Sequence, residues 1–233
     1  MALLAYDLDP TGGLAGPRLT ALLDLGFPCN LACGGCVRGR QRGRPNRAPA
    51  LAVAERLAAL VAETAAATTS VVLFGGEPLL DADTVVTAAA RVRDACARAG
   101  CGYDATVITN ATLLDGFCAR RLSRAGVTTL QVSIPLGGRG APGALDRARF
   151  GRILRSVREA REELDVLVRF EVDGTDDLRE ALSTVRVLER EGLLSPPHPA
   201  AVLLGPRASY AAQARALFLA RPARTASAVT RCP

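Results

Sequence analysis

Six short apolar segments alternate with helical segments along the chain, and this alternation constrains the fold more than any other feature of the sequence. The apolar segments lie at 21–26, 70–78, 103–112, 128–135, 164–174 and 200–206. Strands that are apolar throughout are typical of sheets covered on both faces, and strands separated by helices pair in parallel through right-handed crossovers. The sequence therefore predicts an α/β fold and leaves two architectures open, a partial barrel and an open doubly wound sheet.

A helical segment follows each apolar segment. We expect helices at 50–67, 81–98, 146–163, 175–192 and 208–220. A further helix, between the third and fourth apolar segments, is expected to end at Gly126. Gly126 and Gly192 suit helix C-termini, because glycine readily adopts the left-handed conformation of a C-terminal cap. The chain accordingly divides into an N-terminal extension (1–19), a barrel (20–207) and a C-terminal helix and tail (208–233).

Polar and reactive residues follow several of the expected strands. Three cysteines come after the first strand, and the segment Gly-Gly-Glu-Pro comes after the second. Asn110 ends the third strand, Ser133 lies late on the fourth, and Glu171 and Asp173 lie late on the fifth. In both architectures ligands bind beyond the carboxyl ends of the strands. The sequence therefore predicts a functional site at this rim.

The composition excludes several classes of function. All 29 basic residues are arginines, so the chain has no lysine for a Schiff base or for a phosphate-binding loop. Five arginines lie within 38–47, where they form a solvated loop or a positive lip for an acidic substrate. Aromatic residues do not interleave them, so we expect no nucleic-acid partner. Because no secretory signal or membrane-length apolar run is evident, we expect a cytoplasmic protein without a membrane partner.

The spacing of Cys29, Cys33 and Cys36 indicates a metal centre with one open position. Structural zinc sites use four ligands, usually from two pairs, and here the second pair is missing and the one histidine, His198, lies far away in a proline-rich turn. A ferredoxin-like cluster needs a fourth cysteine. A cluster with three cysteine ligands leaves one iron open for chemistry. We expect the distant Cys96, Cys101 and Cys118 to be buried thiols on helices.

Three motifs on successive expected strands together resemble the radical SAM superfamily. They are "CNLACGGC", "FGGEPLL" and "VITNATLLDGFCARRLSRAGVTTLQVSI". The last is similar to the corresponding region of the branch that matures peptides and sulfatases. The resemblance covers roughly residues 20 to 206.

This resemblance implies a partial (β/α)6 barrel and an enzyme that cleaves S-adenosylmethionine to a 5′-deoxyadenosyl radical, which abstracts hydrogen from a substrate. It implies that Cys29, Cys33 and Cys36 bind three irons of a [4Fe–4S] cluster and that S-adenosylmethionine chelates the fourth. The implied substrate is a ribosomally made peptide, with a small molecule as the alternative. The implied electron donor is a protein such as flavodoxin or ferredoxin.

The resemblance also assigns residues to S-adenosylmethionine. Gly75 and Gly76 allow the backbone to approach a ligand closely, and Glu77 accepts from the methionine ammonium group. Asn110 and Ser133 match positions that contact the ribose or the carboxylate. Arg169 is expected to pair with the methionine carboxylate and, on an alternating strand, faces the same way as Glu171 and Asp173.

The chain departs from the family pattern at several positions. Gly35 stands where an aromatic residue is usual, Pro135 and Leu136 replace an aspartate and glycine, and "TNGT" becomes "TNAT". The chain ends shortly after Cys232, where peptide-maturing members continue into a cysteine-rich SPASM or twitch region, so residues 208–233 could be its remnant. Two other hypotheses are a degenerate barrel that serves as a partner subunit and a zinc-stabilised α/β domain.

Overall fold

The computed structural model describes residues 2–9, 16–33, 36, 43–136, 147–172, 175–194, 200–204 and 229–231. The chain divides into two compact units. Unit 1 contains Met1–Asn30, Gln41–Thr109 and Phe117–Leu130, and unit 2 contains Leu31–Arg40, Asn110–Gly116 and Gln131–Pro233. Among the helices of the described ranges, none is long and apolar enough to cross a bilayer.

The strands of unit 1 lie in sequence order: β1 (Leu3–Asp9), β2 (Arg18–Asp24), β3 (Thr68–Phe74) and β4 (Gly102–Thr109). β2, β3 and β4 are parallel, and β1 runs antiparallel to β2. The sequence analysis placed no strand before residue 20. β1 therefore adds an antiparallel partner to the edge strand of the parallel sheet, which removes an unpaired edge there.

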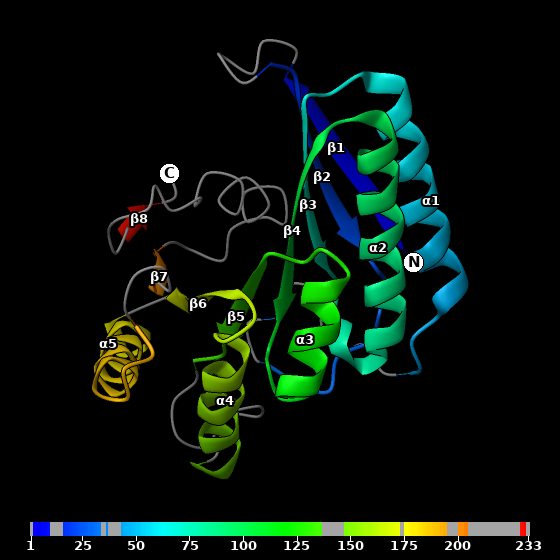
Figure 1. Ribbon diagram of the computed structural model, residues 1–233. Helices are drawn as coiled ribbons and strands as arrows, with labels where there is room; N and C mark the ends of the chain where they lie inside the picture. The colour runs from blue at the N-terminus through cyan, green and yellow to red at the C-terminus, as the bar shows by residue number, and fades with distance from the viewer. Residues whose placement is uncertain are drawn as a thin grey trace. The chain divides into compact units, whose positions relative to one another are not determined.

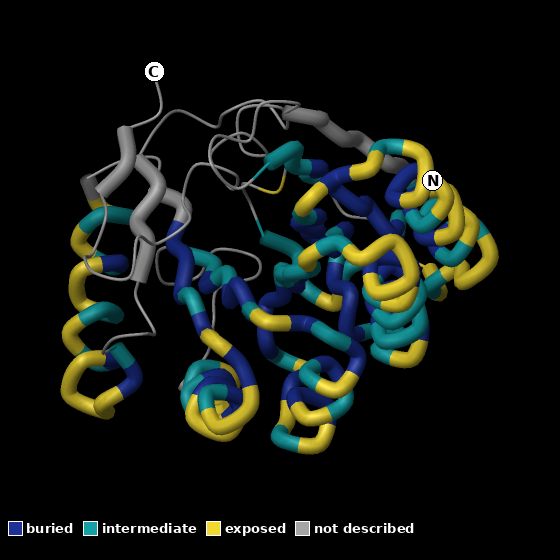
Figure 2. The backbone as a smooth tube through the Cα atoms, turned by 45° about the horizontal axis from the view of Figure 1, so that its top comes forward, coloured by how far each residue is buried: buried dark blue, intermediate teal, exposed yellow. Residues whose placement is uncertain are grey.

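Two long helices of unit 1, α1 (Arg47–Thr64) and α2 (Ala82–Ala99), lie side by side against these strands (Figure 1). Their outward sides are exposed and their inward sides are buried (Figure 2). The short 3₁₀ turn η2 (Pro78–Asp81) precedes α2, and α3 (Gly116–Arg124) follows β4. The apolar side chains that α1 and α2 bury include Leu57, Leu60, Val61, Val85 and Val92.

Unit 2 holds the second half of the repeating pattern. β5 (Thr129–Ile134) is divided between the units and is followed by α4 (Arg147–Ala160), β6 (Asp165–Val172), α5 (Thr175–Arg190), β7 (Ala200–Leu204) and β8 (Val229–Arg231). β6, β7 and β8 lie in this order and are parallel. Ile153 and Val157 of α4 and Val168 and Phe170 of β6 are completely buried.

Glycines end α3 and α5, as the sequence predicted. Gly126 (φ +94°) follows α3, and Gly192 (φ +67°) follows α5. In both cases the next residue donates its amide back into the last turn, from Val127 to Leu122 at 3.0 Å and from Leu193 to Leu188 at 2.8 Å. These bonds satisfy carbonyl groups that the helix itself leaves unpaired.

All six predicted strands are present as β2 to β7, and the parallel pairing is confirmed for β2–β3, β3–β4 and β6–β7. Their ends are displaced by a few residues. β3 ends at Phe74 because Gly75 and Gly76 turn the chain at φ +119° and +58°. The helix expected at 208–220 lies outside the described residues, as does most of the C-terminal tail.

The end of α1 generates a test of backbone strain. Ala65 caps α1 at φ +47°, a conformation in which an alanine Cβ is crowded. Ala65→Gly should therefore raise the free energy of unfolding by about 1 kcal/mol. The matched change Ala59→Gly, at an exposed site inside the same helix, should lower it by about 0.5–1 kcal/mol. Denaturant unfolding measures both, and a loss of stability at Ala65→Gly would contradict the strain argument.

Candidate functional site

The turn after β3 packs directly onto the segment that leads into the first cysteine. A Cβ at Gly75 would lie 2.2 Å from Oδ1 of Asp24, and a Cβ at Gly76 would lie 2.1 Å from the carbonyl oxygen of Phe27. Both glycines also have positive φ. Only glycine therefore fits at these two positions, and the close approach among the described residues is to the chain's own backbone.

Glu77 is fixed in this turn by three hydrogen bonds. Its backbone amide donates to the carbonyl of Pro28 at 2.8 Å. Its Oε1 accepts from the amide of Leu79 at 3.0 Å and from the hydroxyl of Thr109 at 2.7 Å. The residue is completely buried, and a buried carboxylate is tolerated only where donors or cations surround it. Glu77 is therefore held with a defined orientation next to Pro28, the residue before Cys29.

None of the three cysteines of the motif forms a disulfide. Cys29 and Cys33 are half-buried and Cys36 is exposed. The amide of Cys36 donates to the carbonyl of Cys33 at 3.2 Å, so these two residues belong to one turn. Within the described ranges, no three or more histidine, cysteine or acidic side chains are grouped as a metal site. As a donor set, three reduced and accessible thiols fit an iron–sulfur cluster, since soft thiolates are its preferred ligands.

Asn110 begins a tight turn after β4. Its Oδ1 accepts from the amide of Thr112 at 3.0 Å and from the Thr112 hydroxyl at 2.6 Å. Ala111 between them has φ +57°, which explains why glycine suits this position better. The side-chain amide of Asn110 is therefore oriented by its own turn.

The remaining predicted residues lie on the strands of unit 2. Ser133 is half-buried on β5, and Arg169 is only 6% exposed on β6. Asp173, His198, Cys232 and Gly35 lie outside the described residues, as does the side chain of Glu171.

The predicted site residues are thus distributed over the two units. Gly75, Gly76 and Glu77 meet the segment before Cys29 within unit 1. The other predicted ligands, Cys33, Cys36, Asn110, Ser133 and Arg169, belong to unit 2.

Cys96 and Cys118, away from the motif, are buried thiols on helices. Cys96 is completely buried and Cys118 is 8% exposed, which confirms their expected burial. Burial and a hydrogen bond with Cys101 raise the pKa of Cys96 to about 12. The expectation for Cys101 was wrong: it follows the end of α2, is half-buried and has its Sγ 3.5 Å from the hydroxyl of Thr69. Because the thiolate is the metal ligand, the high pKa of Cys96 disfavours metal binding there.

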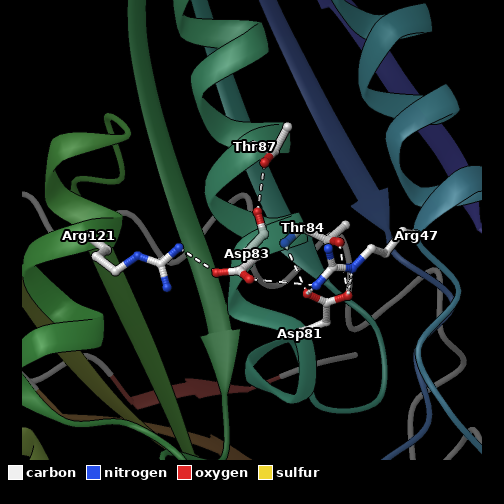
Figure 3. A network of polar contacts seen from close by, with 6 residues as sticks. All are labelled: Arg47, Asp81, Asp83, Thr84, Thr87 and Arg121. Atoms are coloured by element: carbon white, nitrogen blue, oxygen red, sulfur yellow. Dashed lines mark hydrogen bonds and ion pairs between the residues drawn. The ribbon is translucent and has the colours of Figure 1, made fainter.

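Sequence reasoning missed two features beside the site. Asp24 is buried at the end of β2, and its Oδ1 accepts from the amide of Gly26 at 2.8 Å. The sequence signal that could have pointed to Asp24 was an acidic residue within the apolar segment 21–26. The second feature is the ion pair of Arg47 and Asp81, with 2.7 Å from Nε to Oδ2 (Figure 3). Nothing in the sequence links these two positions.

Of the five arginines at 38–47, one takes part in this ion pair. Arg38, Arg40 and Arg42 lie outside the described residues, and Arg44 is exposed. Arg47 is exposed, but it is the first residue of α1 and pairs with Asp81, so it is not part of the loop.

The crowding at Gly76 can be tested against a glycine with a similar backbone conformation. Gly76 and Gly100 have φ of +58° and +67°, but a Cβ at Gly100 would meet nothing within 4 Å. Gly100→Ala should cost about 1 kcal/mol of unfolding free energy, whereas Gly76→Ala should cost about 3 kcal/mol or more because its Cβ meets backbone atoms. Denaturant unfolding distinguishes them, and equal losses would show that the packing on Phe27 is unimportant.

Comparisons with known proteins agree on one family. The Radical SAM superfamily matches residues 26–176. Native anSMEcpe with bound AdoMet is 18% identical, with a TM-score of 0.54 over 78% of this chain and 50% of that chain. Methylornithine synthase (PylB) is 12% identical, with a TM-score of 0.53 over 80% of this chain and 52% of that one. SuiB of Streptococcus suis is 16% identical, with a TM-score of 0.52 over 87% of this chain and 45% of that chain.

One further structure in this set is native anSMEcpe with AdoMet and the Cp18Cys peptide, at 16% identity and a TM-score of 0.51 over 78% of this chain and 49% of that chain. The chain spans about half the length of these structures. At such identities the likeness shows the fold, an α/β partial barrel with an open sheet. No curated protein sequence matches the chain. Because the family match covers more than half of its length, the chain belongs to the radical SAM superfamily, a family of enzymes whose cofactors are a [4Fe–4S] cluster and S-adenosylmethionine.

Proposed function

We propose that this chain is a radical SAM enzyme that abstracts hydrogen from a peptide, with Cys29, Cys33 and Cys36 as the ligands of its cluster. When bound, a reduced [4Fe–4S] cluster supplies the electron that cleaves S-adenosylmethionine to methionine and a 5′-deoxyadenosyl radical. The chain's own residues bind and orient the cofactors and exclude water from them. Residues 20–207 form the catalytic barrel in this proposal. Its setting is the cytoplasm, where thiols stay reduced.

The observation that carries the proposal is the contact between the Gly76–Glu77 turn and the Phe27–Pro28 segment. It places the backbone amide of Glu77, a completely buried residue, on the carbonyl of Pro28, the residue that precedes Cys29. In the proposal Glu77 accepts a hydrogen bond from the ammonium group of S-adenosylmethionine, a charge-assisted bond that is strongest where water is excluded.

The proposal also assigns three residues of unit 2 to the cofactor. The buried Arg169 offers a planar donor group that suits the methionine carboxylate. Asn110, oriented by its bonds with Thr112, and Ser133 supply polar groups for the ribose. A carboxylate ligand offers a buried arginine an opposite charge with which to pair.

A peptide substrate is supported by one structural neighbour. The anSMEcpe protein has been solved with AdoMet and the Cp18Cys peptide, and the "TNAT" to "VSI" region resembles that branch. A small molecule is the alternative, because methylornithine synthase has an equally similar fold. The electron donor in the proposal is a protein such as flavodoxin or ferredoxin, which dithionite replaces in an assay.

The cysteine assignment predicts which thiols retain iron. After anaerobic reconstitution, Cys29→Ala, Cys33→Ala and Cys36→Ala should each lose most of the bound iron and sulfide, because the cluster needs all three thiolates. Cys118→Ala removes a buried thiol of α3, and this variant should bind as much iron and sulfide as the unmodified chain. Iron and sulfide analysis measures this. One zinc and no iron in the unmodified protein would instead support a zinc-stabilised domain.

Glu77 should affect the binding of S-adenosylmethionine and not the loading of the cluster. Glu77→Gln keeps an oxygen that can accept from Leu79 and Thr109, so folding and iron content should change little. It removes the negative charge, so the affinity for S-adenosylmethionine should fall about 10-fold or more, as expected for a charge-assisted bond worth about 1.5–3 kcal/mol.

Two measurements check this prediction. Equilibrium binding of S-adenosylmethionine compares the two proteins, and the release of 5′-deoxyadenosine with dithionite reports its cleavage. Unchanged binding by Glu77→Gln would remove Glu77 from the site, and a fully loaded protein that never releases 5′-deoxyadenosine would overturn the enzymatic proposal.

A further inference from the structure

We propose that Arg47 and Asp81 form an exit anchor for the cysteine segment, defined as residues 29–46, and that Arg47 is a positioning residue for the cluster ligands. The inference rests on the proposed function for its link to the cluster. The anchor itself is a property of unit 1 and can be tested without any cofactor.

The beginning of the cysteine segment is held by η2 and the turn before it. The amide of Glu77 donates to the carbonyl of Pro28 at 2.8 Å, directly before Cys29. A Cβ at Gly76 would lie 2.3 Å from the same carbonyl oxygen. These contacts bind the chain at Pro28, and they form the entry anchor of the segment.

The end of the cysteine segment is held by the same short turn. Arg47, the first residue after the segment, donates from Nε to Oδ2 of Asp81 at 2.7 Å and from its terminal nitrogen to Oδ1 at 3.0 Å (Figure 3). A two-point arginine–carboxylate pair fixes orientation as well as distance. Asp81 is the last residue of η2, so both ends of the segment are bound to residues 76–81.

The Asp81 carboxylate is oriented for its pair with Arg47 by other contacts. Its carboxylate caps α2 by accepting from the amide of Thr84 at 3.2 Å and from the Thr84 hydroxyl at 3.0 Å. Its side chain is only 9% exposed. The hydrogen bond and charge of Asp81 raise the pKa of Arg47 above its usual value. Asp81 is thus oriented by a helix cap, whereas the Arg47 side chain that pairs with it is 60% exposed.

A second carboxylate supports the anchor from α2. Asp83 lies 3.6 Å from Arg47 and also pairs with Arg121 of α3 at 2.5 Å (Figure 3). Hydrogen bonding and charge from Arg121, and then the charge of Arg47, lower the pKa of Asp83. Asp83 therefore stays ionised, and Arg47 lies between two negative charges.

Anchoring both ends lowers the conformational entropy of the cysteine segment. Fixing both ends of a segment reduces the number of conformations that its residues can adopt, and this reduces the cost of bringing three cysteines to one cluster. Releasing the exit anchor raises that cost. The cluster should then be lost more readily, although Arg47 and Asp81 are not its ligands.

The test uses two variants that each remove one ion pair between α1 and the region of α2. Asp81→Asn removes the charge but keeps an acceptor for the cap with Thr84, because asparagine caps helices as well as aspartate does. Glu55→Gln breaks the pair of Glu55 with Arg91, which also joins α1 and α2 but lies away from the cysteine segment. Neither change creates or removes a cleavage site for trypsin.

Two rates are measured. In the iron-free protein, trypsin cleavage after the arginines of the cysteine segment should be several-fold faster in Asp81→Asn than in the unmodified chain and unchanged in Glu55→Gln. In the reconstituted protein, transfer of iron to a chelator should follow the same order. Arg47→Lys, which keeps the charge but cannot form the two-point pair, should behave like Asp81→Asn and serves if Asp81→Asn does not fold.

Each outcome decides the inference. Equal trypsin rates in Asp81→Asn and Glu55→Gln would overturn the anchor. Faster cleavage with unchanged iron transfer would overturn the positioning role of Arg47. A failure of the unmodified chain to bind iron would overturn the proposed function, and the trypsin rates would then decide the anchor alone.

Discussion

The pairing of β2 and β3 in parallel is the constraint on which the candidate site depends. Asp24 and Phe74 are register partners, and the amide of Leu25 continues the ladder by donating to Phe74 at 2.8 Å. The chain therefore leaves both strands at the same edge of the sheet. The cysteine segment and the Gly76–Glu77 turn have to pass each other there, and two glycines make that passage possible because no Cβ fits between the two backbones.

Burial gives the polar groups at this edge their orientation. Glu77 is completely buried, yet its amide and its Oε1 have donors and acceptors on three different elements of unit 1. Asp81 is held in the same way by Thr84 and Arg47. Hydrogen bonds of this kind keep buried carboxylates in one position. A short turn thus fixes the proposed cofactor acceptor and both ends of the proposed cluster segment.

Much of the fold was predictable because it depends on local patterns. The six apolar segments gave β2 to β7, and Gly126 and Gly192 marked two helix ends. β1 was missed because it is an antiparallel edge strand without a helical crossover, so it lies outside the repeating pattern. The ends of the strands expected at 70–78 and 103–112 were placed too late, because positive φ at Gly75, Gly76 and Ala111 turns the chain after Phe74 and soon after Thr109.

The sequence by itself determined the order of the elements, the parallel pairing and the motifs that carry the chemistry, because periodicity and spacing are local properties. Only the tertiary structure decided that Gly76 approaches the carbonyls of Phe27 and Pro28, and that Arg47 pairs with Asp81. Only it could show that burial raises the pKa of Cys96. These contacts join residues far apart in the chain, and the register of the sheet and the packing of α1 against α2 set their distances.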